Sequence, residues 1–139
     1  STVSHLPEVR LPPFPANVVV LDDSDEEADN PYGVDNHYSD RDYTINVDIP
    51  EFNCVCPKTG LPDFGTIHIK YVPNKHIVEL KSLKLYVVKY RHVGIYHEHV
   101  TNRLMDDFKK ACNPKELSIV GDFHPRGGIK TVVRSEWKK

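Results

Sequence analysis

Residues 66–72 read Thr-Ile-His-Ile-Lys-Tyr-Val, and this alternation of apolar and polar side chains is typical of a β-strand. Ile67, Ile69 and Tyr71 share one face, because successive side chains of an extended chain point to opposite sides. Residues 43–47, Tyr-Thr-Ile-Asn-Val, alternate in the same way. Both stretches predict half-buried antiparallel strands.

The segment between these strands, residues 50–64, contains three prolines and a glycine. Proline cannot donate to a strand ladder and glycine weakens a strand, so the whole segment is predicted to be a loop. This loop carries Cys56 and Asp63.

The pattern then changes to helical spacing, which predicts helices over about residues 82–91 and 98–112. Ser82 suits the N-cap of the first helix, Gly94 marks its end, and Asn113 ends the second. The apolar positions that define the two helices are Leu83, Val87 and Tyr90, then Val100, Leu104, Phe108 and Ala111.

Two further strands are predicted at residues 117–121 and 129–133. The order strand, strand, helix, helix, strand, strand suits an α+β domain: a four-stranded antiparallel sheet with both helices packed on one face. The other face then needs a different cover, for which we expect oligomerisation.

The charge is divided unevenly along the 139 residues. Residues 1–42 hold ten acidic and two basic side chains, whereas residues 43–139 hold ten acidic and sixteen basic ones. We expect an extended, acidic and proline-rich arm over 1–42, partly disordered, and one catalytic domain over 43–139. The cationic domain suits anionic ligands, although a solvated basic surface explains the same charge.

No apolar run is long enough to cross a bilayer and no secretory signal pattern opens the sequence, so we expect a soluble, cytoplasmic protein with no membrane contact. The three cysteines are an odd number, and Cys54 and Cys56 lie too close together to brace a fold. Reduced thiols are therefore expected. The cysteine spacing also lacks a zinc pattern, and no metal is expected.

Cys56 is the candidate nucleophile. Its loop is polar and rigid, Lys58 lies two residues on, and Asp63 is able to donate or accept a proton near the thiol. The alternative is an ordinary loop cysteine. Cys54 and Cys112 suit the role of small buried hydrophobes.

Two further groups of residues suit ligand binding. Lys81 and Lys84 share a face at the start of the first predicted helix and, with Arg126, could bind phosphate; a solvated basic face is the alternative. His97 and Glu98 precede the second helix, where a carboxylate suits a guanine-like edge and a histidine suits proton donation; capping by Glu98 and a surface histidine explain the pair equally well.

Taken together, these segments resemble the short, single-module nitrile reductases of queuosine biosynthesis, the QueF family. The resemblance covers residues 43–133 and rests on four motifs in order. They are Cys-Pro-Lys-Thr-Gly with Pro-Asp-Phe at 56–64, Glu-Leu-Lys-Ser-Leu-Lys-Leu-Tyr at 79–86, His-Glu at 97–98, and Gly-Asp-Phe leading to Arg-Gly-Gly at 121–128.

The resemblance implies the tunnelling fold, assembled into ring-shaped homo-oligomers with active sites at subunit interfaces, two stacked pentamers being one such arrangement. It implies reduction of 7-cyano-7-deazaguanine to 7-aminomethyl-7-deazaguanine by two NADPH, for transfer RNA modification, without direct binding of nucleic acid. Cys56 would form a covalent thioimide, and Asp63 and His97 would handle protons. The implied substrate-binding residues are Val78, Glu79, Leu80, His97 and Glu98, and the implied NADPH-binding residues are Lys81, Ser82, Lys84 and Arg126.

Relatives with the same fold fit less well. GTP cyclohydrolase I needs zinc ligands at spacings that this sequence lacks, and two-module reductases are about twice as long. The archaeal enzyme that adds ammonia to the nitrile lacks the paired lysines found here at Lys81 and Lys84. Some family members protect the nucleophile with a cysteine after the His-Glu step, whereas His99 follows here; Cys54 and Cys112 remain the possible substitutes. A non-catalytic purine-binding protein is the alternative outside enzymes.

Overall fold

The computed structural model describes residues 33–139. Most of the expected arm, residues 1–32, lies outside the described residues. Within the last part of that arm, β1 (Gly33–Asp35) pairs with β4 (His76–Val78) in a small two-stranded sheet that the sequence did not predict. Asn36 is 8% exposed and its side-chain amide donates to the carbonyl of Asn74 at 2.6 Å. The described end of the arm therefore contacts the domain.

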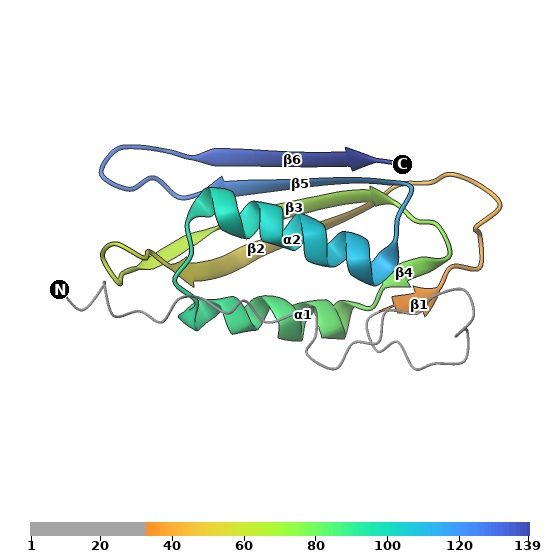
Figure 1. The fold of residues 1–139 in the computed structure, drawn as a ribbon, viewed down its shortest axis with the longest axis horizontal. Helices are drawn as coiled ribbons and strands as arrows, with labels where there is room; N and C mark the ends of the chain where they lie inside the picture. The colour runs from red at the N-terminus through yellow and green to blue at the C-terminus, as the bar shows by residue number, and fades with distance from the viewer. Residues whose placement is uncertain (1–32) are drawn as a thin grey trace.

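The main sheet has four antiparallel strands in the order β2-β3-β5-β6. Figure 1 shows them side by side, with β6 at one edge and β2 at the other. The strands are β2 (Ile45–Val55), β3 (Pro62–Val72), β5 (Glu116–Phe123) and β6 (Val132–Lys138). This arrangement confirms the prediction of an α+β fold with an antiparallel sheet.

The helices cover one face of this sheet (Figure 1). α1 (Leu80–Val88) continues into the 3₁₀ helix η2 (Lys89–His92), which packs on β2, and α2 (His97–Cys112) packs on β5 and β6. The apolar side chains of both helices meet those of the strands in a single core. The opposite face of the sheet is polar: His68 and Lys70 of β3 are exposed there.

The predicted loop over residues 50–64 was wrong. β2 continues to Val55 and β3 begins at Pro62, so only residues 56–61 form the turn. β2 passes its proline by a register shift between Ile49 and Phe52, which is the irregularity that allows proline within a sheet. Pro62 is tolerated because it is the first residue of its strand.

Two element boundaries also differ from the prediction. α1 begins at Leu80, with Glu79 as the N-cap in place of Ser82, because the Glu79 carboxylate accepts from the backbone N–H groups of Lys81 and Ser82. The last strand is 132–138 and not 129–133, because residues 126–129 form a tight turn in which Arg126 and Ile129 exchange backbone hydrogen bonds.

A buried polar network fastens α1 to α2. The Tyr86 hydroxyl donates to Asp107 Oδ2 at 2.5 Å and lies 2.7 Å from the Tyr90 hydroxyl. Arg103 Nε reaches the same carboxylate oxygen at 3.1 Å. Burial raises the pKa of Asp107 above its ordinary value, and the hydrogen bond from Tyr86 and the charge of Arg103 oppose that rise.

Asp107→Ala should lower the free energy of unfolding by about 1–3 kcal/mol, because it removes the acceptor of the buried Tyr86 hydroxyl. Asp106→Ala is the matched control, since Asp106 is exposed on the same helix. Urea denaturation of both variants measures the difference. Equal stabilities would contradict a stabilising role for the network.

Candidate active site

Cys56 lies immediately after β2, at the start of the turn 56–61. Its backbone N–H donates to the carbonyl of Leu61 at 2.8 Å, and its carbonyl accepts from Gly60 at 2.9 Å. These two bonds close the turn tightly and leave Cys56 only 7% exposed. The thiol is therefore held in a fixed place by the backbone.

The surroundings of Cys56 favour the thiolate. Burial alone raises the pKa of a thiol, but here the hydrogen bonds outweigh it. They come from the side chains of Thr59 and Arg126 and from the backbone N–H groups of Thr59 and Lys58, and they lower the pKa of Cys56 to about 7. A substantial fraction of Cys56 is then ionised near neutral pH.

The other two cysteines have the opposite surroundings. Cys54 is completely buried in the core, and burial, reinforced by the charge of Asp63, raises its pKa to about 12. Cys112 is 1% exposed, and burial raises its pKa to about 12 as well. Both are free thiols. Of the three cysteines, Cys56 alone has a pKa below its ordinary value.

Asp63, the second residue of β3, lies between the side chains of Arg126 and His97. Its side chain is 3% exposed, with Oδ1 2.7 Å from Arg126 Nη1 and Oδ2 3.1 Å from His97 Nε2. The contact with Arg126 is an ion pair without hydrogen-bond geometry. The Asp63 carboxylate thus connects β3 to α2 and to the segment after β5.

His97 is the first residue of α2, and its side chain is 14% exposed. Its ring stacks on that of Phe123, with the ring centroids 3.8 Å apart and the planes at 4°. Glu98 follows in the first turn of α2 and is exposed. Tyr96, the N-cap residue, makes no side-chain capping bond.

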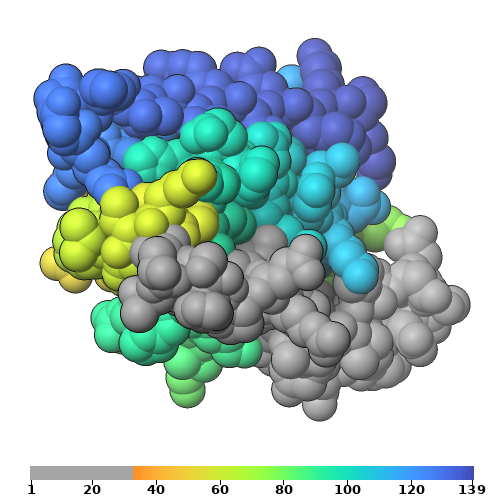
Figure 2. Space-filling model, turned by 60° about the vertical axis from the view of Figure 1, so that its left-hand side comes forward, coloured from red at the N-terminus to blue at the C-terminus, as the bar shows by residue number. Residues whose placement is uncertain are grey.

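Arg126 reaches the cluster from the segment between β5 and β6. Its Nη2 lies 3.5 Å from Thr59 Oγ1, in addition to its contacts with Cys56 and Asp63. Figure 2 shows this end of the molecule, where the turn 56–61 (yellow) lies beside the segment after β5 (blue). Thr59 and Phe123 were not predicted as site residues. The sequence signals for them are a hydroxyl three residues after Cys56 and an aromatic residue two positions after the predicted strand 117–121.

The remaining predicted residues lie elsewhere in the chain. Figure 1 shows the start of α1 beside β4, at the opposite end of that helix from the turn 56–61. Lys81, Lys84 and Leu80 are exposed there. Val78 and Ser82 are buried, and the Ser82 hydroxyl donates to Glu79 Oε1 at 2.9 Å.

Within one chain, the predicted residues therefore form two groups. Cys56, Asp63, His97 and Arg126 come together with Glu98 next to His97, whereas residues 78–84 stay apart from them.

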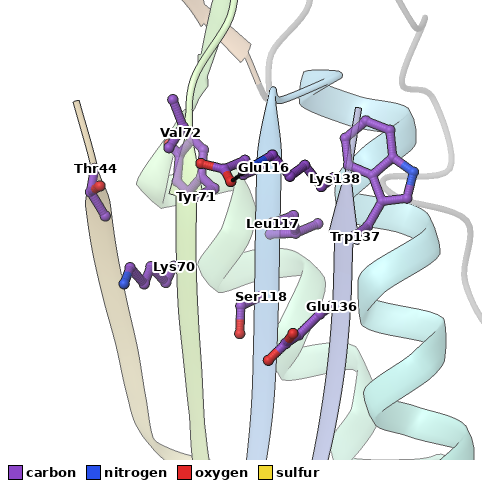
Figure 3. A pocket seen from close by; sticks show the side chains of 10 residues that line it. All are labelled: Thr44, Lys70, Tyr71, Val72, Glu116, Leu117, Ser118, Glu136, Trp137 and Lys138. Carbon is purple, nitrogen blue, oxygen red and sulfur yellow. Dashed lines mark ion pairs between the residues drawn. The ribbon is translucent and has the colours of Figure 1, made fainter. Parts of the chain in front are cut away.

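A shallow hollow of about 540 Å³ lies on the sheet away from this cluster. Figure 3 shows its lining side chains, which come from Thr44, just before β2, and from the three strands β3, β5 and β6. Lys70 is seven residues along β3 from Asp63, or roughly 23 Å in an extended strand. None of the predicted site residues lines it.

Within residues 33–139, no three His, Cys, Asp or Glu side chains are grouped so that they could hold a metal ion. The same part of the chain contains no helix that is both long and apolar enough to span a membrane.

Arg126→Gln should raise the pKa of Cys56 from about 7 toward the ordinary thiol value of about 8.5. The thiolate exists above the pKa, so the alkylation rate at pH 7 should fall about tenfold. The pH profile of iodoacetamide labelling, followed by intact mass, measures this change. Arg134→Gln, an exposed change on β6, should keep the profile of the unmodified protein. An unchanged profile in Arg126→Gln would contradict thiolate stabilisation by Arg126.

Comparison with known proteins gives a consistent result. Residues 62–139 match the family model described as QueF-like protein. The NADPH-dependent 7-cyano-7-deazaguanine reductase of Chloroherpeton thalassium is 54% identical over 104 residues, which cover 75% of this chain and 90% of that protein. The protein of the same name from Chlorobaculum tepidum is 51% identical over 105 residues, covering 76% and 90%.

A solved structure also matches the fold. The archaeosine synthase QueF-Like in its apo form aligns with a TM-score of 0.63 and 22% identity, covering 67% of this chain and 91% of that one. At this identity the likeness concerns the fold alone. The match to the family model and the relatives at about half identity are decisive: the chain belongs to the QueF-like family, together with the NADPH-dependent 7-cyano-7-deazaguanine reductases.

Proposed function

We propose that this protein reduces the nitrile of 7-cyano-7-deazaguanine to the aminomethyl group of 7-aminomethyl-7-deazaguanine, consuming two NADPH, in the biosynthesis of the transfer RNA modification queuosine. The relatives' names make the family one of NADPH-dependent oxidoreductases. The observation that carries the proposal is the thiol of Cys56, with a pKa lowered to about 7, beside the Asp63–His97 pair.

The first step is covalent. The Cys56 thiolate adds to the nitrile carbon, a C–S bond replaces one C–N π bond, and the nitrogen takes a proton to give a thioimide. Hydride from the first NADPH then adds to the thioimide carbon, and the C–S bond breaks to release the thiolate and an imine. Hydride from the second NADPH and one more proton convert the imine to the amine. Two hydrides and two protons account for the four hydrogens gained.

The protons pass through Asp63 and His97. Their contact of 3.1 Å allows a proton to be shared between carboxylate and imidazole next to the reacting carbon. The contacts of Arg126 with Cys56 and Asp63 favour a role in stabilising the thiolate over the phosphate-binding role that the resemblance implies. Lys81, Lys84 and Ser82 remain the proposed NADPH-binding residues.

The deazaguanine is held from two sides. Glu98 accepts the donors of the guanine-like edge, and the segment Val78, Glu79 and Leu80 contributes the rest of the pocket. Because residues 78–84 lie away from Cys56 within one chain, the complete site needs residues 78–84 of a second copy. We therefore propose ring-shaped homo-oligomers of the tunnelling fold with active sites between subunits.

The surface around α1 supports this assembly. Leu80 is 62% exposed, Leu85 53% and Val88 37%. A groove of about 390 Å³ runs between α1 and β2, with Leu80 and Val88 among its lining. Exposed apolar surface of this kind marks contact with another protein surface.

The unmodified protein, mixed with the nitrile substrate without NADPH, should gain the mass of the substrate. Cys56→Ala should gain nothing, because the attacking thiolate is absent, and Cys112→Ala should form the adduct like the unmodified protein. Intact mass spectrometry measures all three. Folded protein that forms no adduct and oxidises no NADPH would refute the reductase proposal.

Lys84→Ala should raise the KM for NADPH about tenfold, since one charge-assisted hydrogen bond to phosphate contributes about 1.5 kcal/mol. Formation of the Cys56 adduct without NADPH should stay unchanged. Lys89→Ala, an exposed lysine on η2, is the matched control. Absorbance of the nicotinamide gives KM, and an equal KM in both variants would place the phosphates elsewhere.

A further inference from the structure

Phe123 stacks on the ring of His97, the proposed proton donor. It is the last residue of β5, it is completely buried, and its ring lies parallel to that of His97 at a centroid distance of 3.8 Å. At this distance the two rings are in van der Waals contact over their faces. No other ring stacks on His97 among residues 33–139.

Two glycines leave the space in which the Phe123 ring lies. A Cβ atom on Gly65 of β3 would come 3.1 Å from Phe123 Cδ1, and one on Gly121 of β5 would come 2.7 Å from Phe123 Cε2. Phe52 contacts the same ring edge-on at a centroid distance of 6.5 Å. The backbones of two strands therefore fix the plane of the Phe123 ring.

The same surroundings hold the backbone of His97. The Thr101 hydroxyl donates to the His97 carbonyl at 2.8 Å, and a Cβ atom on Gly121 would come 2.6 Å from that hydroxyl oxygen. The first turn of α2 is thus seated directly on β5 beside Phe123. With the backbone of His97 fixed, the orientation of its ring depends on its two side-chain torsions.

The contact with Asp63 fixes only one point of the His97 ring, the atom Nε2. A single point of contact leaves the ring free to turn about the line that joins the two atoms. The face of Phe123 removes this freedom, because a tilt of the imidazole in either direction drives one edge into the phenyl ring or opens a gap in a buried contact.

We propose that Phe123 is a positioning residue: its ring fixes the plane of the His97 imidazole, so that Nε2 stays directed at Asp63 and the proton is delivered to a fixed point. Its effect on turnover rests on the proposed nitrile reduction. The orientation of His97 does not, because it is a property of the protein without ligand.

Replacing Phe123 with Leu removes the ring face and leaves an apolar side chain in the core. We expect kcat to fall by about ten- to a hundredfold, since misplacing a reacting group by about 1 Å costs up to about 10²-fold. KM for the nitrile should change little. Rates are divided by the number of sites that form the Cys56 adduct, so that unfolded protein does not count. Phe123→Met, which keeps an unbranched side chain of similar volume, serves if the Leu variant folds poorly.

Phe52→Leu is the matched control. Phe52 is 2% exposed and contacts Phe123, but it does not stack on His97. Phe52→Leu removes the same atoms as Phe123→Leu from the same core, so it should destabilise the protein similarly. Its kcat per adduct-forming site should stay near that of the unmodified protein.

The orientation itself is measured by NMR of protein labelled with ¹³C-histidine, without substrate. His97 carbon-bound ring protons lie over the phenyl face and should be shifted upfield by its ring current. The resonance is assigned by its loss in His97→Asn. In Phe123→Leu it should move to the ordinary histidine range, and in Phe52→Leu it should stay.

Two results would overturn the proposal: a His97 resonance that does not move in the Phe123 variants, or an equal loss of kcat per site in Phe52→Leu. If the unmodified protein neither forms an adduct nor oxidises NADPH, the proposed function fails. The NMR result still decides the orientation of His97.

Discussion

The buried carboxylate of Asp63 is the constraint on which the rest of this site depends. Removing a charge from water costs several kcal/mol unless partners replace the lost hydration. The partners here are His97 at the start of α2 and Arg126 in the segment after β5. β3, α2 and the segment after β5 must therefore pack together before the carboxylate has both of its partners. Arg126 also contacts Cys56, so the same docking that satisfies the carboxylate creates the surroundings of the thiolate.

The elements that bury a regular apolar pattern could be predicted from the sequence. β3 and α2 differ from their predictions, residues 66–72 and 98–112, mainly in where they begin. Predictions failed where a tertiary contact overrides local preference. Pro50 suggested a loop, but neighbouring hydrogen bonds carry β2 past it through a register shift. β1 and β4 are three residues each, too short to show a period, and only their pairing with each other defines them.

Cys56 could be chosen from the sequence as the candidate nucleophile, because a thiol in a polar, proline-bracketed turn is unusual among buried cysteines. The pKa of Cys56 could not be predicted from its own turn alone, because Arg126, one of the side chains that lower it, is distant in sequence. Arg126 lies seventy residues after Cys56, and its basic charge looked equally suited to phosphate. Phe123 belongs to the Gly-Asp-Phe motif at 121–123, which does not indicate a contact with His97. That contact exists because α2 packs on β5. Such contacts follow from topology, which local pattern does not encode.

Glu79 caps α1 with a carboxylate that already accepts from two backbone N–H groups and one hydroxyl. The N–H of Lys81 is the main cause that holds the pKa of Glu79 below its ordinary value. Any ligand donor that approaches this carboxylate must compete with the helix for the same oxygens. Binding there exchanges hydrogen bonds instead of adding them, so the net affinity gained is small and depends on geometric fit. A capping residue of this kind is better at discriminating between similar ligands than at holding any of them tightly.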